Sequence, residues 1–232
     1  MNNAGVGGWA TDQIVLRAEQ LADELLPRTI VMSFLADDIL RARFRVYGSA
    51  NKPWFDIGPQ GDLVHHNNPV PPFSGKPSEV GFSPLGYFRV VTWAIDRIGL
   101  GTWLRRGDQN VAVGNDPVAV SCKLLERAAN SFRERNIRLV FMLQHGGDDR
   151  HDRTSQKRHA DRVLDCARTA GIETIDTWPV LLTHFNKGLP VYRDLFVMHD
   201  NGKIYGHMSP KGNALIAELV AKTLRGGPGA AQ

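Results

Sequence analysis

The second half of the sequence alternates apolar runs with helical patterns, and this alternation constrains the fold more than any other feature. Residues 137–143 and 172–175 are apolar runs of strand length. Apolar residues at helical spacing cover residues 117–132 and 154–170, ahead of each run. Strands that alternate with helices in this way pair in parallel, with helices on both faces of the sheet. We therefore predict an α/β fold of three layers, with a parallel sheet in the middle.

The first half continues the pattern and adds an excursion. A helix is predicted over residues 11–26, where Pro27 ends it, and a buried strand over 30–35. Two short extended runs within residues 52–72 surround a Gly-Pro-Gln-Gly turn, which predicts a hairpin insertion. A further helix is predicted over residues 85–98.

Length and composition favour one domain over residues 1–225, with a flexible tail at 226–232. A chain of 232 residues that is 42% hydrophobic can bury a substantial core, and it contains no apolar run of 18 residues that would predict a membrane span. Cys122 and Cys166 fall on predicted helices and are expected to be buried thiols. The sequence does not predict a cellular compartment.

A net charge of +4 raises the question of nucleic-acid binding. The arginines are scattered along the chain or interleaved with acids, and no nucleic-acid motif accompanies them. We therefore expect a solvated basic surface and no nucleic-acid partner.

One histidine, His207, lies just ahead of a clearly marked helix start. Ser209 can cap this helix, Pro210 suits its first turn, and an apolar face follows. His207 is therefore expected on a rigid loop between a strand and a helix. Hydrolases that use a Ser/His/Asp triad place their general base at such a junction.

A second motif, Asn-Ala-Gly-Val-Gly-Gly-Trp-Ala-Thr-Asp-Gln over residues 3–13, leads into the first predicted helix. Glycines let backbone amides approach a ligand closely, and such amides can bind a developing oxyanion. With the segment 33–39 and the His207 motif, this run resembles three motif blocks of the SGNH (GDSL-like) hydrolase family, in the same order.

The resemblance implies a flavodoxin-like fold and an ester hydrolase that needs no cofactor and no metal. Its substrate would be a small-molecule, carbohydrate or lipid acyl ester. His207 would be the general base, and the amide of Gly8 would contribute to the oxyanion hole. Asp37 stands where the family places an asparagine that completes this hole. An ionised Asp37 would repel an oxyanion, so it serves only if protonated or if it binds another group; otherwise Asp37 and Asp38 are a helix cap and a solvated acid.

The nucleophile of the family is missing from the sequence. No Gly-Asp-Ser occurs in the 232 residues, and Ser49, the nearest imitation, lies in a predicted turn. We expect the first strand of the family's sheet to be missing as well. The strand over residues 30–35 would then have an unpaired edge, which predicts poor solubility, a homo-oligomer or a rearrangement.

The histidine also needs a carboxylate to orient it. The family places an aspartate three residues before the histidine, where this chain has Ile204. Asp200 is the first candidate for this role, and Asp194 is the second.

Two other functions stay open. The chain could be a ligand-binding remnant that keeps the cleft without the chemistry. Alternatively, the loop from His145 to His151, with two imidazoles and two carboxylates, could hold a metal ion that activates water, although its spacing matches no strong metal motif.

Overall fold

The computed structural model describes residues 2–48, 50–72, 110–147 and 154–226, and the chain divides into two compact units. The larger unit contains residues 1–42, 55–64 and 115–232, and the smaller contains 43–54 and 65–114. All candidate site residues except Ser49 belong to the larger unit. Ser49 and the helix predicted over 85–98 lie outside the described residues. The single domain expected over residues 1–225 stays a prediction.

A parallel sheet forms the centre of the larger unit. Its strands are β1 (Thr29–Leu35), β7 (Arg138–Gln144) and β8 (Glu173–Asp176), in the order β1-β7-β8. Leu35 pairs with Gln144 and Leu143 pairs with Asp176, so all three strands end at the same edge. The prediction of an α/β fold with a parallel sheet is confirmed.

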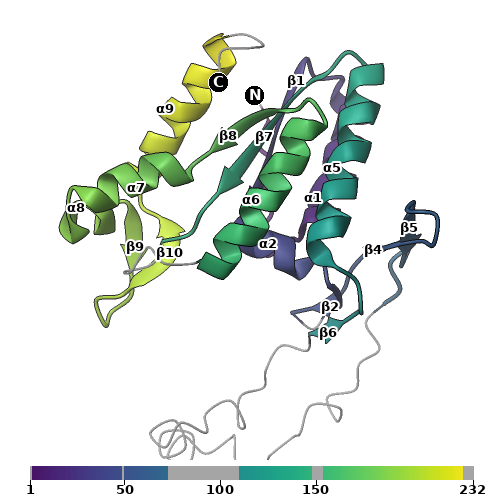
Figure 1. Cartoon of the computed structure of the whole chain (residues 1–232), viewed down its shortest axis with the longest axis horizontal. Coiled ribbons are helices and arrows are strands. Elements are labelled where there is room, and N and C mark those ends of the chain that lie inside the picture. Colours follow the sequence, from purple (N-terminus) through teal and green to yellow (C-terminus); the bar gives the residue numbers. More distant parts are fainter. Residues whose placement is uncertain (1, 49, 73–109, 148–153, 227–232) are drawn as a thin grey trace, which may run out of the picture. The chain divides into compact units, whose positions relative to one another are not determined.

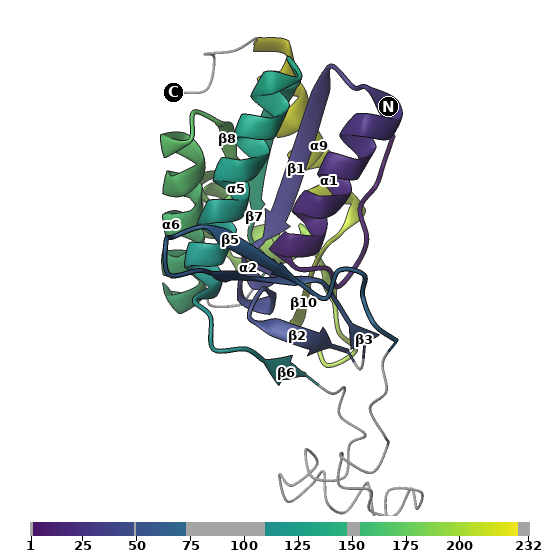
Figure 2. The same ribbon diagram turned by 90° about the vertical axis from the view of Figure 1, so that its right-hand side faces the viewer.

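Helices cover both faces of this sheet, as the alternation of side chains along β7 shows. Leu139, Phe141 and Leu143 join a large apolar cluster with α1, α2, α5 and α6, whereas Val140 and Met142 pack against α9. Figures 1 and 2 show α5 and α6 together on one side of the sheet and α9 apart from them. The helices span α1 (Thr11–Leu25), α2 (Ala36–Arg41), α5 (Pro117–Glu134), α6 (Thr154–Thr169) and α9 (Pro210–Gly226).

The strand β1 is an edge strand of this sheet among the described residues, and it is only half buried. Met32 and Phe34 point into the large cluster, but Val31, on the other face, is 37% exposed. The prediction of a buried strand was therefore wrong for one face. The expected unpaired edge is present in the described part of the sheet, where β7 is the only partner of β1.

Between β8 and α9, the sequence predicted only that a strand precedes His207. This segment forms α7 (Trp178–Asn186), α8 (Leu189–Arg193) and an antiparallel hairpin of β9 (Phe196–Met198) and β10 (Ile204–Met208). These elements share a separate small core. Its buried members are Leu181, Tyr192, Leu195 and Phe196.

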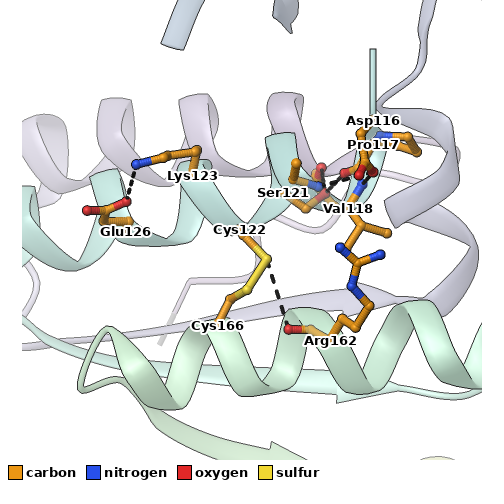
Figure 3. The surroundings of a disulfide bond; sticks show 11 residues. Asp116, Pro117, Val118, Ser121, Cys122, Lys123, Glu126, Arg162 and Cys166 are labelled. Atoms are coloured by element: carbon orange, nitrogen blue, oxygen red, sulfur yellow. Dashed lines mark hydrogen bonds and ion pairs between the residues drawn. A yellow bond between two sulfur atoms is a disulfide. The ribbon is translucent and has the colours of Figure 1, made fainter. Parts of the chain in front are cut away.

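The two cysteines form a disulfide instead of the predicted free thiols. Cys122 of α5 and Cys166 of α6 have Cα atoms 5.4 Å apart, and the bond ties the two neighbouring helices together (Figure 3). The two helices were predicted correctly, but their relative rotation, which brings the sulfur atoms together, has no local signal in the sequence.

The predicted hairpin is confirmed: β4 (Trp54–Ile57) and β5 (Leu63–His66) form a two-stranded sheet, and their residues are divided between the two units. In the smaller unit, β2 (Phe44–Tyr47), β3 (Ala50–Asn51) and β6 (Val111–Ala112) form an antiparallel sheet in the order β3-β2-β6. None of the helices in the described ranges has the length and apolar character needed to cross a membrane.

Candidate functional site at the carboxyl edge of the sheet

The glycine-rich loop ends at the start of α1. Gly8 is exposed and has a φ of +80°, a conformation that favours glycine, and a Cβ at this position would meet nothing within 4 Å. The carbonyl of Trp9 accepts a hydrogen bond from Nη1 of Arg41 at 3.4 Å. Thr11 is buried and its hydroxyl lies 2.9 Å from that of Ser121 on α5. These contacts fix the end of the loop at Trp9 and Thr11, directly after Gly8.

The segment after β1 folds into the short helix α2. Asp38 is buried there; its Oδ2 accepts from the Leu35 N–H at 2.8 Å and its Oδ1 from Arg41 at 2.6 Å. Burial raises the pKa of Asp38 to about 6, against the opposing effects of the Leu35 N–H and the Arg41 charge. A helix cap is therefore present in this pair of acids, but it is Asp38, which is buried and not a solvated acid. Asp37 directly precedes Asp38 and is half buried. It is the residue proposed for the oxyanion hole.

The carboxyl end of β7 carries a buried histidine, His145, beside the end of β8. Its Nε2 lies 3.4 Å from Oδ1 of Asp176, and its backbone N–H donates to Oγ1 of Thr177 at 3.1 Å. Burial alone would raise the pKa of Asp176, but the His145 imidazole and the Trp178 N–H favour the charged carboxylate, and the net pKa is lowered. These contacts fix the start of the loop after β7.

The loop after β7 also contacts the strand that carries His207. The Gly147 N–H donates to the carbonyl of Gly206 at 3.3 Å. A Cβ on Gly147 would lie 2.6 Å from the Phe196 ring and 2.7 Å from Ile204, so only glycine fits between the loop and the hairpin. His207 directly follows Gly206.

His207 lies within β10 and not on the loop that the sequence predicted. The predicted helix start is confirmed: the hydroxyl of Ser209 accepts from the Gly212 N–H at 3.2 Å, and α9 begins at Pro210. A Cβ on Gly212 would lie 2.1 Å from the carbonyl of Leu195, which explains the glycine of this motif. The motif therefore holds the start of α9 against the hairpin, and this contact lies directly after His207 in the sequence.

Neither candidate orienting aspartate bonds to His207 within the described ranges. Asp200 lies in the exposed turn between β9 and β10, and Oδ2 of Asp194 pairs with Nζ of Lys211 at 3.0 Å. The His207 ring contacts that of Tyr205, with 4.9 Å between their centroids. The assignment of Asp200 as the orienter stays a prediction.

The proposed metal loop can be followed only in part, because residues 148–153 lie outside the described residues. In the part of the chain that the structure describes, no three His, Cys, Asp or Glu side chains cluster as metal ligands would. His145, the first histidine of that loop, faces Asp176.

Together these contacts bring four segments far apart in sequence to one edge of the sheet. Arg41 joins the Gly8 loop to α2, the Leu35–Gln144 pair joins β1 to β7, and Gly147 joins β7 to the His207 strand. Ligands of open α/β sheets bind at this carboxyl edge. The contacts of Arg41, His145 and Asp176 were not predicted from the sequence. The only local signal for these contacts was Asp176, the acidic residue directly after the apolar run 172–175.

No protein-family model matches the chain, and no curated protein matches it.

Proposed function

We propose that the larger unit is an ester-hydrolase domain of the SGNH type, acting on acyl esters of a carbohydrate or a lipid. In this proposal the Gly8 amide binds the developing oxyanion, Asp37 lies beside it, and His207 moves the proton, with Asp200 as its candidate partner. The main support is the set of contacts that gathers the Gly8 loop, α2, the loop after β7 and the His207 strand.

This chain of 232 residues contains no Gly-Asp-Ser, so we propose that it binds an ester without efficient turnover. A general base needs a nucleophile to activate, and without one the site keeps only binding and oxyanion stabilisation. The serine would come from a longer form of the protein.

The proposal requires that the Gly8 loop and His207 lie close together, since no reacting centre spans a separation beyond about 15 Å. A cross-linking experiment tests this. Both native cysteines are in the disulfide, so two introduced cysteines would be the only free thiols. The variant Gly7→Cys with His207→Cys should be joined by a short bis-maleimide, because Gly7 has open space for a side chain.

The matched control pairs Leu26→Cys with His207→Cys. Leu26 is 81% exposed and follows the opposite end of α1, about 22 Å along a 15-residue helix. Equal yields from the two pairs, or no cross-link in the first, would refute the proposed site.

Activity is tested with p-nitrophenyl acetate on this chain and on a form extended upstream of Met1 that carries a Gly-Asp-Ser. The extended form should hydrolyse the ester, and His207→Ala should reduce its turnover by about 100- to 10,000-fold. The 232-residue chain should show no turnover above its own His207→Ala variant. Activity that a chelator abolishes would favour the metal-dependent alternative instead.

A further inference from the structure

The hairpin of β9 and β10 presents a row of three rings on its outer face. The ring centroids of His199 and Tyr205 are 4.6 Å apart, and those of Tyr205 and His207 are 4.9 Å apart. All three side chains are exposed, and Tyr205 is 53% exposed. The proposed general base is therefore one end of an aromatic row.

The outward direction of this row follows from the alternation of side chains along β10. Ile204 and Met208 pack against the core under the hairpin, so Tyr205 and His207, which are offset by one residue, point the other way. The backbone between them is held by the Gly147 hydrogen bond to Gly206. The backbone that carries Tyr205 and His207 is thus supported between the two residues.

The chemistry of the row suits a sugar ring better than an acyl chain. A tyrosine ring offers a flat apolar face with partial negative charge, which attracts the C–H groups of a pyranose. Each side chain of the row also carries a hydrogen-bonding group, namely the Tyr205 hydroxyl and the ring nitrogens of His199 and His207. Hydroxyl groups can pair with these atoms, whereas an acyl chain would leave them without partners.

We propose that His199, Tyr205 and His207 form the sugar-binding subsite of this domain, with a pyranose ring stacked on Tyr205 and its acyl ester beside His207. This assignment rests on the proposed ester-hydrolase function and specifies its substrate class as a carbohydrate ester.

The test measures binding to the full chain, which needs no nucleophile. The probes are the methyl 6-O-acetyl glycosides of glucose, galactose and mannose, followed by saturation-transfer NMR and by titration of the protein's amide signals. At least one of these probes should bind and shift the amide signals of residues 199–207. Tyr205→Leu should weaken that binding about tenfold, while Tyr205→Phe, which keeps the ring, should retain most of it.

The thermal midpoints of both variants should match that of the parent chain, since Tyr205 lies outside the core. Unchanged binding in Tyr205→Leu, or equal losses in the Leu and Phe variants, would overturn the stacking role. Failure of all three sugar esters to bind would also overturn the subsite.

The Gly7–His207 cross-link separates this failure from that of the parent proposal. A positive cross-link, together with binding of p-nitrophenyl octanoate in preference to the sugar esters, would leave the ester-hydrolase site in place and replace the sugar by a lipid.

Discussion

The two faces of the parallel sheet are held by different means. Under α1, α2, α5 and α6, a large buried cluster closes the face, and a disulfide joins α5 to α6. Under α9, the buried cluster consists of only Val140, Met142, Ile175 and Ile216 among the described residues. The strand that carries His207 belongs to the second side, where close backbone contacts at glycines take the place of a large core. The comparison indicates that buried apolar side chains and the disulfide stabilise the first face, whereas the second face depends on close packing at glycines.

The largest expected difference between the faces is seen at adjacent residues of β7. Leu143 is fully buried in the large cluster, and Met142 is 7% exposed in the small one. We expect Leu143→Ala to lower the free energy of unfolding by about 4 kcal/mol and Met142→Ala by about 2 kcal/mol, because the tighter site leaves a larger cavity. Urea unfolding measures both, and equal losses would show that the two faces do not differ in this way.

The disulfide strengthens the first face further. It closes a loop between residues 44 apart in sequence, and the double variant Cys122→Ser, Cys166→Ser should lose about 3 kcal/mol of unfolding free energy. Reductant should destabilise the parent chain by a similar amount and leave the double variant unchanged. Since disulfides persist in oxidising surroundings, we also expect higher yields of folded protein under oxidising conditions. A parent chain insensitive to reductant would contradict the bond.

The sequence predicted the first face better than the second, and the reason is physical. Strands and helices of the first face carry local signals: Asp116 directly precedes α5 and caps it, and its Oδ1 accepts from the Val118 N–H at 2.9 Å. The hairpin of β9 and β10 has short strands with an irregular register, and it obtains its core from α7 and α8. Such non-local support leaves no periodic pattern, so His207 was located in sequence but its strand was not.

The candidate site likewise has features that the sequence predicted and contacts that it did not. The Ser209 cap and the glycine loop could be read from local spacing, and both are present. The pairing of His145 with Asp176 joins residues 31 positions apart, on strands whose register the sequence does not specify. The Arg41 contact to Trp9 depends on the packing of α2 against α1. Contacts of this kind require the fold itself.

The third prediction concerns the buried Asp38 of the first face and the pH dependence that it gives to the free energy of unfolding. The folded chain holds the pKa of Asp38 at about 6, above the unfolded value of 3.8, so the folded state binds the proton more tightly. The resulting stabilisation is complete below pH 3.8 and is lost as the pH rises through 6. Relative to Asp38→Asn, the parent chain should therefore lose up to about 3 kcal/mol of unfolding free energy between pH 4 and pH 7.

The neighbouring variant Asp37→Asn is the control for this measurement. It leaves Asp38 in place and should keep most of the pH dependence. A parent chain whose stability runs parallel to that of Asp38→Asn across this range would show that Asp38 is not desolvated as described.

The smallest effect concerns the fit of the second face. Gly147→Ala should cost about 2 kcal/mol of unfolding free energy, because its Cβ would overlap Phe196 and Ile204. Gly7→Ala is the matched control: its Cβ meets nothing within 4 Å, so we expect a change within about 0.5 kcal/mol. Denaturant unfolding gives both values, and amide signals of residues 204–208 should shift only in the Gly147 variant. If Gly147→Ala cost no more than Gly7→Ala, the loop after β7 would not support the His207 strand, and the second face would need another source of order.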